Sequence, residues 1–231
     1  MGSYIEIDGR DGRFNAYIAR PQTAPASAVV VLHEVFGVNS DIRETCDELA
    51  QQGYIALAPD LFWRQERDVD LDVRSEPDWQ HGLRLYGGYD RDLGVRDIED
   101  TVAAARALPE GTGKAAVLGY CLGGLMVFLT AARSSVDAAI AYHGGDTEKY
   151  LQEAGGIMAP MLMHLADEDE FISKAAQTQI KSALAGQPNI SIYGYPGQNH
   201  AFSRHNGAHY NADAAALAHA RTYDFLGRTL R

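Results

Sequence analysis

One cysteine stands in a context that suits covalent chemistry. Cys121 lies in the segment GYCLGG at 119–124, between the apolar run AAVLG and the apolar stretch GGLMVFLTAA. The run predicts a strand and the stretch a helix, so this is the Gly-x-nucleophile-x-Gly pattern in strand–turn–helix context, with cysteine in the serine position. A thiol at a helix start meets the positive end of the helix dipole, which favours the reactive thiolate. The alternative is a buried cysteine that only packs in a glycine-rich turn.

Two further residues complete a nucleophilic site. In hydrolases with this turn, an acid and then a histidine follow the nucleophile along the chain, each on a loop after a later strand. Asp169 comes just after the apolar run MLMHLA, and His200 comes after the run ISIYGY and the turn PGQN. The sequence therefore predicts Cys121 as nucleophile, His200 as general base and Asp169 as the acid that orients it.

Other interpretations of these two loops remain open. A solvated acidic loop is one of them, and the neighbouring acids that could replace Asp169 are Asp167, Glu168 and Glu170. A metal site made by His200, His205 and His209 is a rival, but the loop that joins them carries no cysteine or glutamate in a zinc-like motif. We therefore expect neither a metal nor a cofactor.

The elements that would position these side chains alternate along the chain. Short apolar runs, typical of strands buried on both faces, occur at 28–33, 54–58, 115–119, 138–142, 161–166 and 189–195. Helical patterns lie between or after them at 42–51, 93–108, 124–132, 174–184 and 212–226. This alternation implies right-handed βαβ crossovers and predicts an α/β fold, with a mostly parallel central sheet covered by helices on both faces.

Two segments depart from this rhythm. At the N-terminus, apolar residues at 4–7 and 14–18 flank a turn-rich stretch at 8–12, which predicts a hairpin. The segment 61–92 carries many charges and several aromatic residues, and we interpret it as an insertion or cap near the carboxyl ends of the strands.

Composition narrows the class of protein. The chain has 231 residues, 46% of them hydrophobic and 22% charged, which is suited to one globular domain over 1–231. Its net charge of −11 disfavours nucleic acid and anionic membranes as partners. The N-terminus has no apolar signal segment, so a cytoplasmic location is expected. Cys46 and Cys121 lie in unlike contexts, which argues against a disulfide framework and predicts a packing role for Cys46.

Five motifs together resemble one enzyme family. They are HEVFGVN at 33–39, GYIALAPDLF at 53–62, GYCLGG at 119–124, DEDEFIS at 167–173 and NHAFSR at 199–204. In order and spacing they are similar to the dienelactone hydrolases, the carboxymethylenebutenolidases of aromatic-compound breakdown. The resemblance implies an α/β-hydrolase fold and a Cys-His-Asp triad on Cys121, His200 and Asp169. It also implies hydrolysis of a small ester or lactone through a thioester.

The same resemblance assigns a role to the loop at 33–39. The family uses a glutamate that contacts the thiol and helps to activate it, and Glu34 matches it. A carboxylate there raises the thiol pKa, whereas transfer of the proton to it leaves thiolate beside imidazole. Backbone N–H groups of Val35 and Leu122, which follow Glu34 and Cys121, are the expected oxyanion hole. An ordinary polar residue at a strand end is the alternative for Glu34.

Substrate recognition is where the chain departs from the family. The family holds a substrate carboxylate with arginines, and Arg204 matches one of them. Trp79 stands where the second would be expected, so an aromatic side chain replaces one of the two cations that hold the carboxylate. Tyr86 and Tyr142 resemble residues that line the family's pocket, although an aromatic side chain can equally fill core space.

The sequence thus predicts an enzyme acting on a small ester or lactone, with or without a free carboxylate, as a monomer or small homo-oligomer. Two alternatives remain. One is a hydrolase of other small esters, with Trp79 as an aromatic wall. The other is a catalytically idle member of the fold that binds a small molecule.

Overall fold

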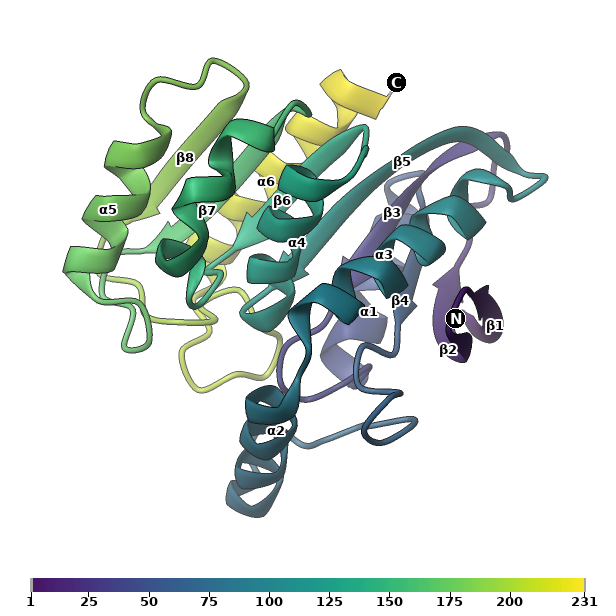
Figure 1. Ribbon diagram of the computed structural model, residues 1–231, viewed down its shortest axis with the longest axis horizontal. Coiled ribbons are helices and arrows are strands. Elements are labelled where there is room, and N and C mark those ends of the chain that lie inside the picture. The colour runs from purple at the N-terminus through teal and green to yellow at the C-terminus, as the bar shows by residue number, and fades with distance from the viewer. Residues whose placement is uncertain (1, 231) are drawn as a thin grey trace. The chain divides into compact units, whose positions relative to one another are not determined.

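The computed structural model describes residues 2–230 and is drawn in Figure 1. The strands are β1 (Ser3–Gly9), β2 (Gly12–Ala19), β3 (Ala26–Leu32), β4 (Ile55–Pro59), β5 (Gly111–Tyr120), β6 (Ala138–Tyr142), β7 (Met161–Ala166) and β8 (Ile190–Tyr195). The helices are α1 (Ser40–Gln51), α2 (Glu76–Gly88), α3 (Arg91–Arg106), α4 (Leu122–Arg133), α5 (Lys174–Leu184) and α6 (Ala212–Leu230), with a 3-10 stretch η1 (Thr147–Gly156). Contacts divide the chain into two compact units, Met1–Val117 and Leu118–Arg231.

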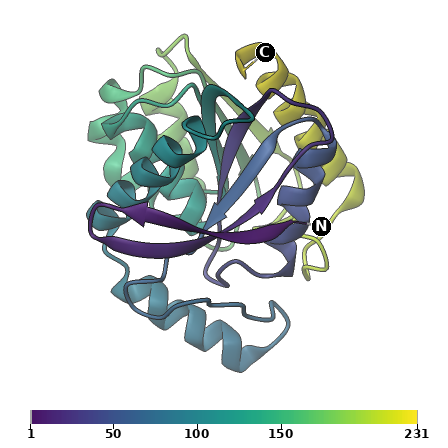
Figure 2. The ribbon, with the colours of Figure 1, turned by 90° about the vertical axis from the view of Figure 1, so that its right-hand side faces the viewer.

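The first unit begins with the predicted hairpin. Strands β1 and β2 pair antiparallel up to the Gly9 and Gly12 pair, and the hairpin faces the viewer in Figure 2. Gly12 has a φ of +144°, a conformation that side chains rarely adopt. Within this unit the strand order is β1-β2-β4-β3, with β2 and β4 antiparallel and β3 and β4 parallel.

Helices cover both faces of this first set of strands. In Figure 1, α3 lies in front of the strands and α1 behind them, and each contacts β3 and β4. Asn39 caps α1 by accepting the Ile42 N–H at 3.2 Å, and Asp90 caps α3 by accepting two N–H groups of its first turn. Strand β3 is buried at every residue, which explains its continuous apolar run ASAVVVL.

The second unit is built around parallel strands. Strand β7 pairs parallel with β6 on one side and with β8 on the other. In Figure 1, α4 and α5 lie in front of these strands and α6 behind them. Buried residues line α4 almost throughout, from Leu122 to Ala131, because the helix packs against both β6 and η1.

The predicted elements are present, with shifted ends. The five predicted helices correspond to α1, α3, α4, α5 and α6, and each predicted strand has its counterpart. Helix α2 and η1 were not predicted. Only Gly82 and Leu85 of α2 are buried, so α2 shows no apolar stripe, although Ser75 and a proline in its first turn mark its start. No helix within residues 2–230 has the length and apolar character to cross a membrane.

Candidate active site

The turn between β5 and α4 has the geometry of a nucleophile elbow. Cys121 sits between them with φ 52° and ψ −112°, a strained conformation for a residue with a side chain. A Cβ at Gly119 would lie 2.4 Å from the Gly123 carbonyl oxygen, so strand and helix pass too closely for a side chain there. Strain held at one residue by such close packing is typical of functional positions.

Contacts with the end of β6 fix this turn from a second side. The Cys121 N–H donates to the Tyr142 carbonyl at 3.1 Å. A Cβ at Gly124 would lie 2.5 Å from the same carbonyl oxygen, so glycine is needed for α4 to begin this close to β6. The thiol is partly exposed, unlike the fully buried Cys46.

Asp169 and His200 form a buried pair in the same unit. The Nδ1–H of His200 donates to the Asp169 carboxylate, at 3.0 Å from Oδ1 and 2.9 Å from Oδ2. Their side chains are only 1% and 2% exposed, respectively. Asp169 Oδ1 also accepts the N–H groups of Phe171 and Ile172, at 2.9 and 3.0 Å, which hold the carboxylate in place. With Nδ1 bonded to Asp169, Nε2 is the ring nitrogen available for proton transfer.

The negative charges around His200 favour its imidazolium form. Burial disfavours the charged ring, but a Cys121 thiolate and the hydrogen-bonded Asp169 outweigh burial and raise the pKa of His200 to about 10. Burial likewise works against ionisation of Asp169, yet the hydrogen bond and charge of His200 lower the pKa of its carboxyl. His200 and Asp169 therefore stabilise each other's charged forms.

The neighbouring acids have other partners. Glu168 accepts from Lys174 at 2.8 Å, and Lys181 lies 3.7 Å from Asp167. Glu170 lies 3.6 Å from His209. Of the four consecutive acids, Asp169 is the one bonded to His200.

Two residues that the sequence analysis did not select lie against His200. The ring centroid of His143 is 4.5 Å from that of His200, and the ring of Phe171 stands edge-on at 4.8 Å. His143 is buried and has a φ of 36°, whereas Phe171 is 57% exposed. Phe171 directly follows the acidic loop, so its position two residues after Asp169 was the available signal. For His143, the only signal in the sequence was its position directly after the run that forms β6.

The first unit carries the predicted loop at 33–39. Glu34 and Val35 follow β3 and are buried. Gly82 of α2 packs so closely on this loop that a Cβ there would lie 2.4 Å from the Val35 carbonyl oxygen. Trp79, also on α2, stands edge-on to Phe36 with centroids 4.7 Å apart and donates from Nε1 to the Val73 carbonyl at 3.0 Å. The segment 61–92 therefore backs the loop that follows β3.

The other predicted pocket residues differ in placement. Tyr86 is half-buried, with the Arg91 guanidinium 5.2 Å from its ring. Arg204 is 9% exposed and lies in the loop after His200. Tyr142 is fully buried, its hydroxyl hydrogen-bonds to Thr222 at 2.7 Å and its ring stacks on His164 at 4.2 Å. These contacts favour a packing role for Tyr142 over a pocket wall.

Two histidines of the rival metal triad, His200 and His209, are oriented by hydrogen bonds from Nδ1, an arrangement that metal-bound histidines share. His209 donates from Nδ1 to the backbone carbonyl of His200 at 3.1 Å. His200 donates from its own Nδ1 to Asp169. Both rings are therefore oriented by protein acceptors.

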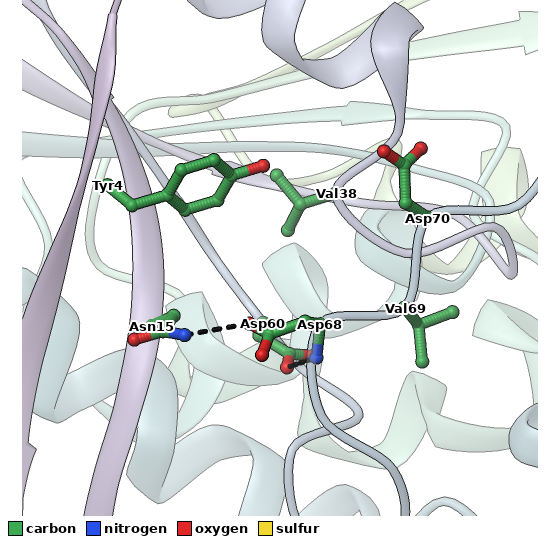
Figure 3. Close-up of a pocket in the computed structure, with 7 residues that line it drawn as sticks. All are labelled: Tyr4, Asn15, Val38, Asp60, Asp68, Val69 and Asp70. Carbon is green, nitrogen blue, oxygen red and sulfur yellow. Dashed lines mark hydrogen bonds between the residues drawn. The ribbon is translucent and has the colours of Figure 1, made fainter.

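A separate cavity of about 420 Å³ lies within the first unit, and Figure 3 shows its lining. Its polar wall comprises Asn15, Asp60, Asp68 and Asp70, and Asn15 donates to Asp68 at 2.7 Å. Asp60 accepts the N–H groups of Phe62 and Asp68, while burial raises the pKa of its carboxyl to about 6. The lining offers no thiol and no histidine, so this cavity does not suit the predicted chemistry.

Comparisons with known proteins point to one enzyme family. The model of the dienelactone hydrolase family matches residues 14–230. A carboxymethylenebutenolidase from Pseudomonas putida is 37% identical over 223 residues, covering 96% of this chain and 94% of the relative. A candidate carboxymethylenebutenolidase from Azospirillum brasilense is 38% identical over 223 residues, with 96% of each chain covered. The crystal structure of a candidate dienelactone hydrolase from Klebsiella pneumoniae subsp. pneumoniae superposes with a TM-score of 0.86 at 26% identity, covering 98% of both chains.

These matches confirm the predicted fold, an α/β-hydrolase fold with a mostly parallel sheet and helices on both faces. They extend over nearly the whole chain and across both compact units. The chain belongs to the dienelactone hydrolase family of ester and lactone hydrolases.

Proposed function

We propose that this chain hydrolyses a small ester or lactone of the dienelactone type through a thioester on Cys121. The observation that carries the proposal is the buried His200–Asp169 pair in the same unit as a cysteine held at φ 52°. The His200 imidazole is buried and its pKa is raised to about 10, with a Cys121 thiolate among the causes. Such a ring is suited to act as the general base for Cys121.

The reaction has two halves. The Cys121 thiolate attacks the carbonyl carbon, and the tetrahedral oxyanion is stabilised by the N–H groups of Val35 and Leu122. The intermediate collapses as the C–O bond to the alcohol or enol breaks, and the His200 imidazolium gives that oxygen its proton. His200 then takes a proton from water, the hydroxide oxygen bonds to the thioester carbon, and the thiolate leaves with the acid released.

Glu34 enters the proposal through the family resemblance. A carboxylate next to the thiol disfavours thiolate until the carboxylate takes up a proton, so the resting nucleophile is protected from oxidation. Glu34 is 3% exposed and follows β3, which is a suitable environment for a carboxyl that exchanges a proton.

The substrate class is proposed from the relatives and from Arg204. The Pseudomonas putida relative is named for a carboxylate-bearing butenolide, and a buried guanidinium binds a carboxylate with two parallel hydrogen bonds. Trp79 at the second position favours a substrate held by one arginine and an aromatic surface. Small neutral esters are the second candidate class because of this replacement. One family model also spans both units, which supports a single domain.

Cys121→Ala tests the proposal directly. The variant should fold and lose turnover of a chromogenic ester, since it lacks the bond-forming sulfur. Cys46→Ala is the matched control, because that thiol is fully buried and burial raises its pKa. Wild-type protein should release one equivalent of alcohol in a burst and show a thioester by intact-protein mass spectrometry. Turnover persisting in pure Cys121→Ala would contradict the mechanism, and tight ligand binding without turnover in wild type would favour the idle binding module.

A further inference from the structure

His33 is a buried histidine directly after β3, and both of its ring nitrogens are hydrogen-bonded. The residue is 0% exposed. The ring Nδ1 lies 2.6 Å from the Glu34 carbonyl oxygen, and the Leu61 N–H donates to Nε2 at 3.0 Å. The Phe62 ring packs at an angle on the imidazole, with centroids 5.0 Å apart. The ring is thus clamped between the loop that follows β3 and the chain after β4.

The two hydrogen bonds determine where the proton sits. A backbone N–H can only donate, so Nε2 must offer its lone pair to Leu61. A carbonyl can only accept, so Nδ1 must carry the proton and donate it to Glu34. Burial lowers the pKa of His33 to about 4, which keeps the ring neutral and this tautomer in place at ordinary pH. A doubly protonated ring would break the bond from Leu61.

The bond to Glu34 acts on a peptide group that matters for the proposed reaction. The carbonyl of Glu34 and the N–H of Val35 belong to one planar peptide unit. This peptide bond is trans, the cis bond within residues 2–230 being Ala24–Pro25. In a trans peptide the carbonyl and the N–H point in opposite directions. A bond that fixes the carbonyl therefore also aims the N–H, and a hydrogen-bonded carbonyl makes the N–H a stronger donor.

Other contacts brace the loop farther along the chain. The Leu71 N–H donates to the Phe36 carbonyl at 3.0 Å, and Gly37 forms an isolated bridge with Asp70. Arg43 donates to the Val38 carbonyl at 2.6 Å. These contacts begin after Val35, whereas the imidazole contacts the peptide unit that joins Glu34 to Val35.

We propose that His33 is a positioning residue that aims the Val35 N–H at the oxyanion by holding the Glu34 carbonyl. The proposal rests on the proposed function, in which Val35 supplies one of the two oxyanion donors. His33 does not touch the substrate; it acts through the peptide unit that does.

The test separates oxyanion stabilisation from nucleophile integrity. His33→Phe keeps an aromatic ring but removes both hydrogen bonds, whereas His33→Gln keeps one donor and one acceptor. Acylation by p-nitrophenyl acetate develops an oxyanion, but alkylation of Cys121 by iodoacetamide, in which iodide leaves, does not. His33→Phe should slow the acylation burst by about 10- to 100-fold, up to the loss seen when an oxyanion donor is removed. Its alkylation rate should stay that of wild type, and His33→Gln should recover most of the acylation rate.

His164→Phe is the matched control. His164 is also 0% exposed, and burial lowers its pKa, so its ring is neutral like that of His33. Its ring nitrogens, however, hydrogen-bond to Tyr195 and Thr222 rather than to the loop that follows β3. This variant should lose stability without changing the ratio of acylation to alkylation. The proposal is overturned if His33→Phe leaves that ratio unchanged, because the ring then has only a structural role.

A measurement on wild type does not depend on the variants folding. Nitrogen-15 NMR of the His33 ring should show a proton on Nδ1 and a bare Nε2 at neutral pH. The opposite tautomer would refute the proposal, since Nδ1 could not donate to Glu34. Failure of the proposed function looks different, because Cys121→Ala would then retain turnover whatever the state of His33.

Discussion

Replacing Asp169 with asparagine should disable the base while leaving its loop in place. Asp169 Oδ1 accepts the N–H groups of Phe171 and Ile172, and in the Asp169→Asn variant only the amide oxygen can take over that position. The amide nitrogen must then occupy the Oδ2 position, 2.9 Å from Nδ1 of His200. Because an amide nitrogen donates, Nδ1 becomes the acceptor and the proton moves to Nε2. A ring protonated at Nε2 cannot take a proton from water.

The size of the effect follows from the same pair. Raising the pKa of His200 from 6.5 to about 10 corresponds to about 5 kcal/mol in favour of the imidazolium. The Cys121 thiolate and Asp169 share this stabilisation against the cost of burial. Loss of the carboxylate and the wrong tautomer together should lower kcat by roughly 10³- to 10⁴-fold, as in other triads with this replacement. The pKa of His200 should fall as well.

Steady-state and burst kinetics on one chromogenic ester measure this, with NMR titration of His200 for the pKa. Asp167→Asn is the matched control on the same loop, since its carboxylate faces Lys181 at 3.7 Å rather than the imidazole. It should keep nearly full activity. An unchanged kcat in Asp169→Asn, or equal losses in both variants, would refute the assignment of the orienting acid.

Three other outcomes are expected. Gly82→Ala places a methyl group 2.4 Å from the Val35 carbonyl oxygen. The variant should lower the free energy of unfolding, measured in urea, by about 1–3 kcal/mol, and it should also lower kcat. Gly87→Ala is the control, because a Cβ there meets open space, and neither quantity should change. Arg204→Ala should raise KM for carboxylate-bearing lactones alone, by about 2–5 kcal/mol of lost binding if the pair is desolvated, and equal losses with neutral esters would exclude this role. The folded pKa of His33 near 4, below its unfolded value of 6.5, means that stability is full above pH 6.5 and falls between pH 6.5 and 4. Wild type should therefore lose about 2 kcal/mol more than His33→Gln in urea unfolding between pH 7 and pH 5, and parallel curves would contradict the buried, neutral ring.

Local patterns were sufficient for most of the architecture. The continuous apolar runs predicted β6 and β7 with the bounds that the structure has, because strands buried on both faces need no polar positions. The GYCLGG turn was also predictable from the local sequence, because the close approach of strand and helix requires glycine at position 119. Helix α2 was not predicted because few of its side chains are buried, so its sequence lacks the apolar periodicity on which such predictions depend.

The parts of the site that could not be predicted depend on contacts between distant segments. His143 and His200 are far apart in the sequence, and only the fold brings their rings to 4.5 Å. His33 stands directly before Glu34 in a motif that was singled out, but its role depends on the Leu61 N–H in a different loop. The motif therefore identified the segment that contributes to the site, whereas the role of an individual residue in it depends on hydrogen bonds to other loops.

Burial alone does not determine which histidine can act as a base. His33, His164 and His200 are 0%, 0% and 2% exposed, yet the pKa is lowered in the first two and raised to about 10 in the third. The first two bond to neutral groups: backbone amides around His33, and hydroxyls around His164. His200 has a carboxylate at 2.9 Å, and negative charge on Cys121 adds to its effect when the thiol ionises. Neighbouring negative charge therefore outweighs desolvation only at His200, and this makes His200 the one histidine of these three suited to carry a proton between the nucleophile, the leaving group and water.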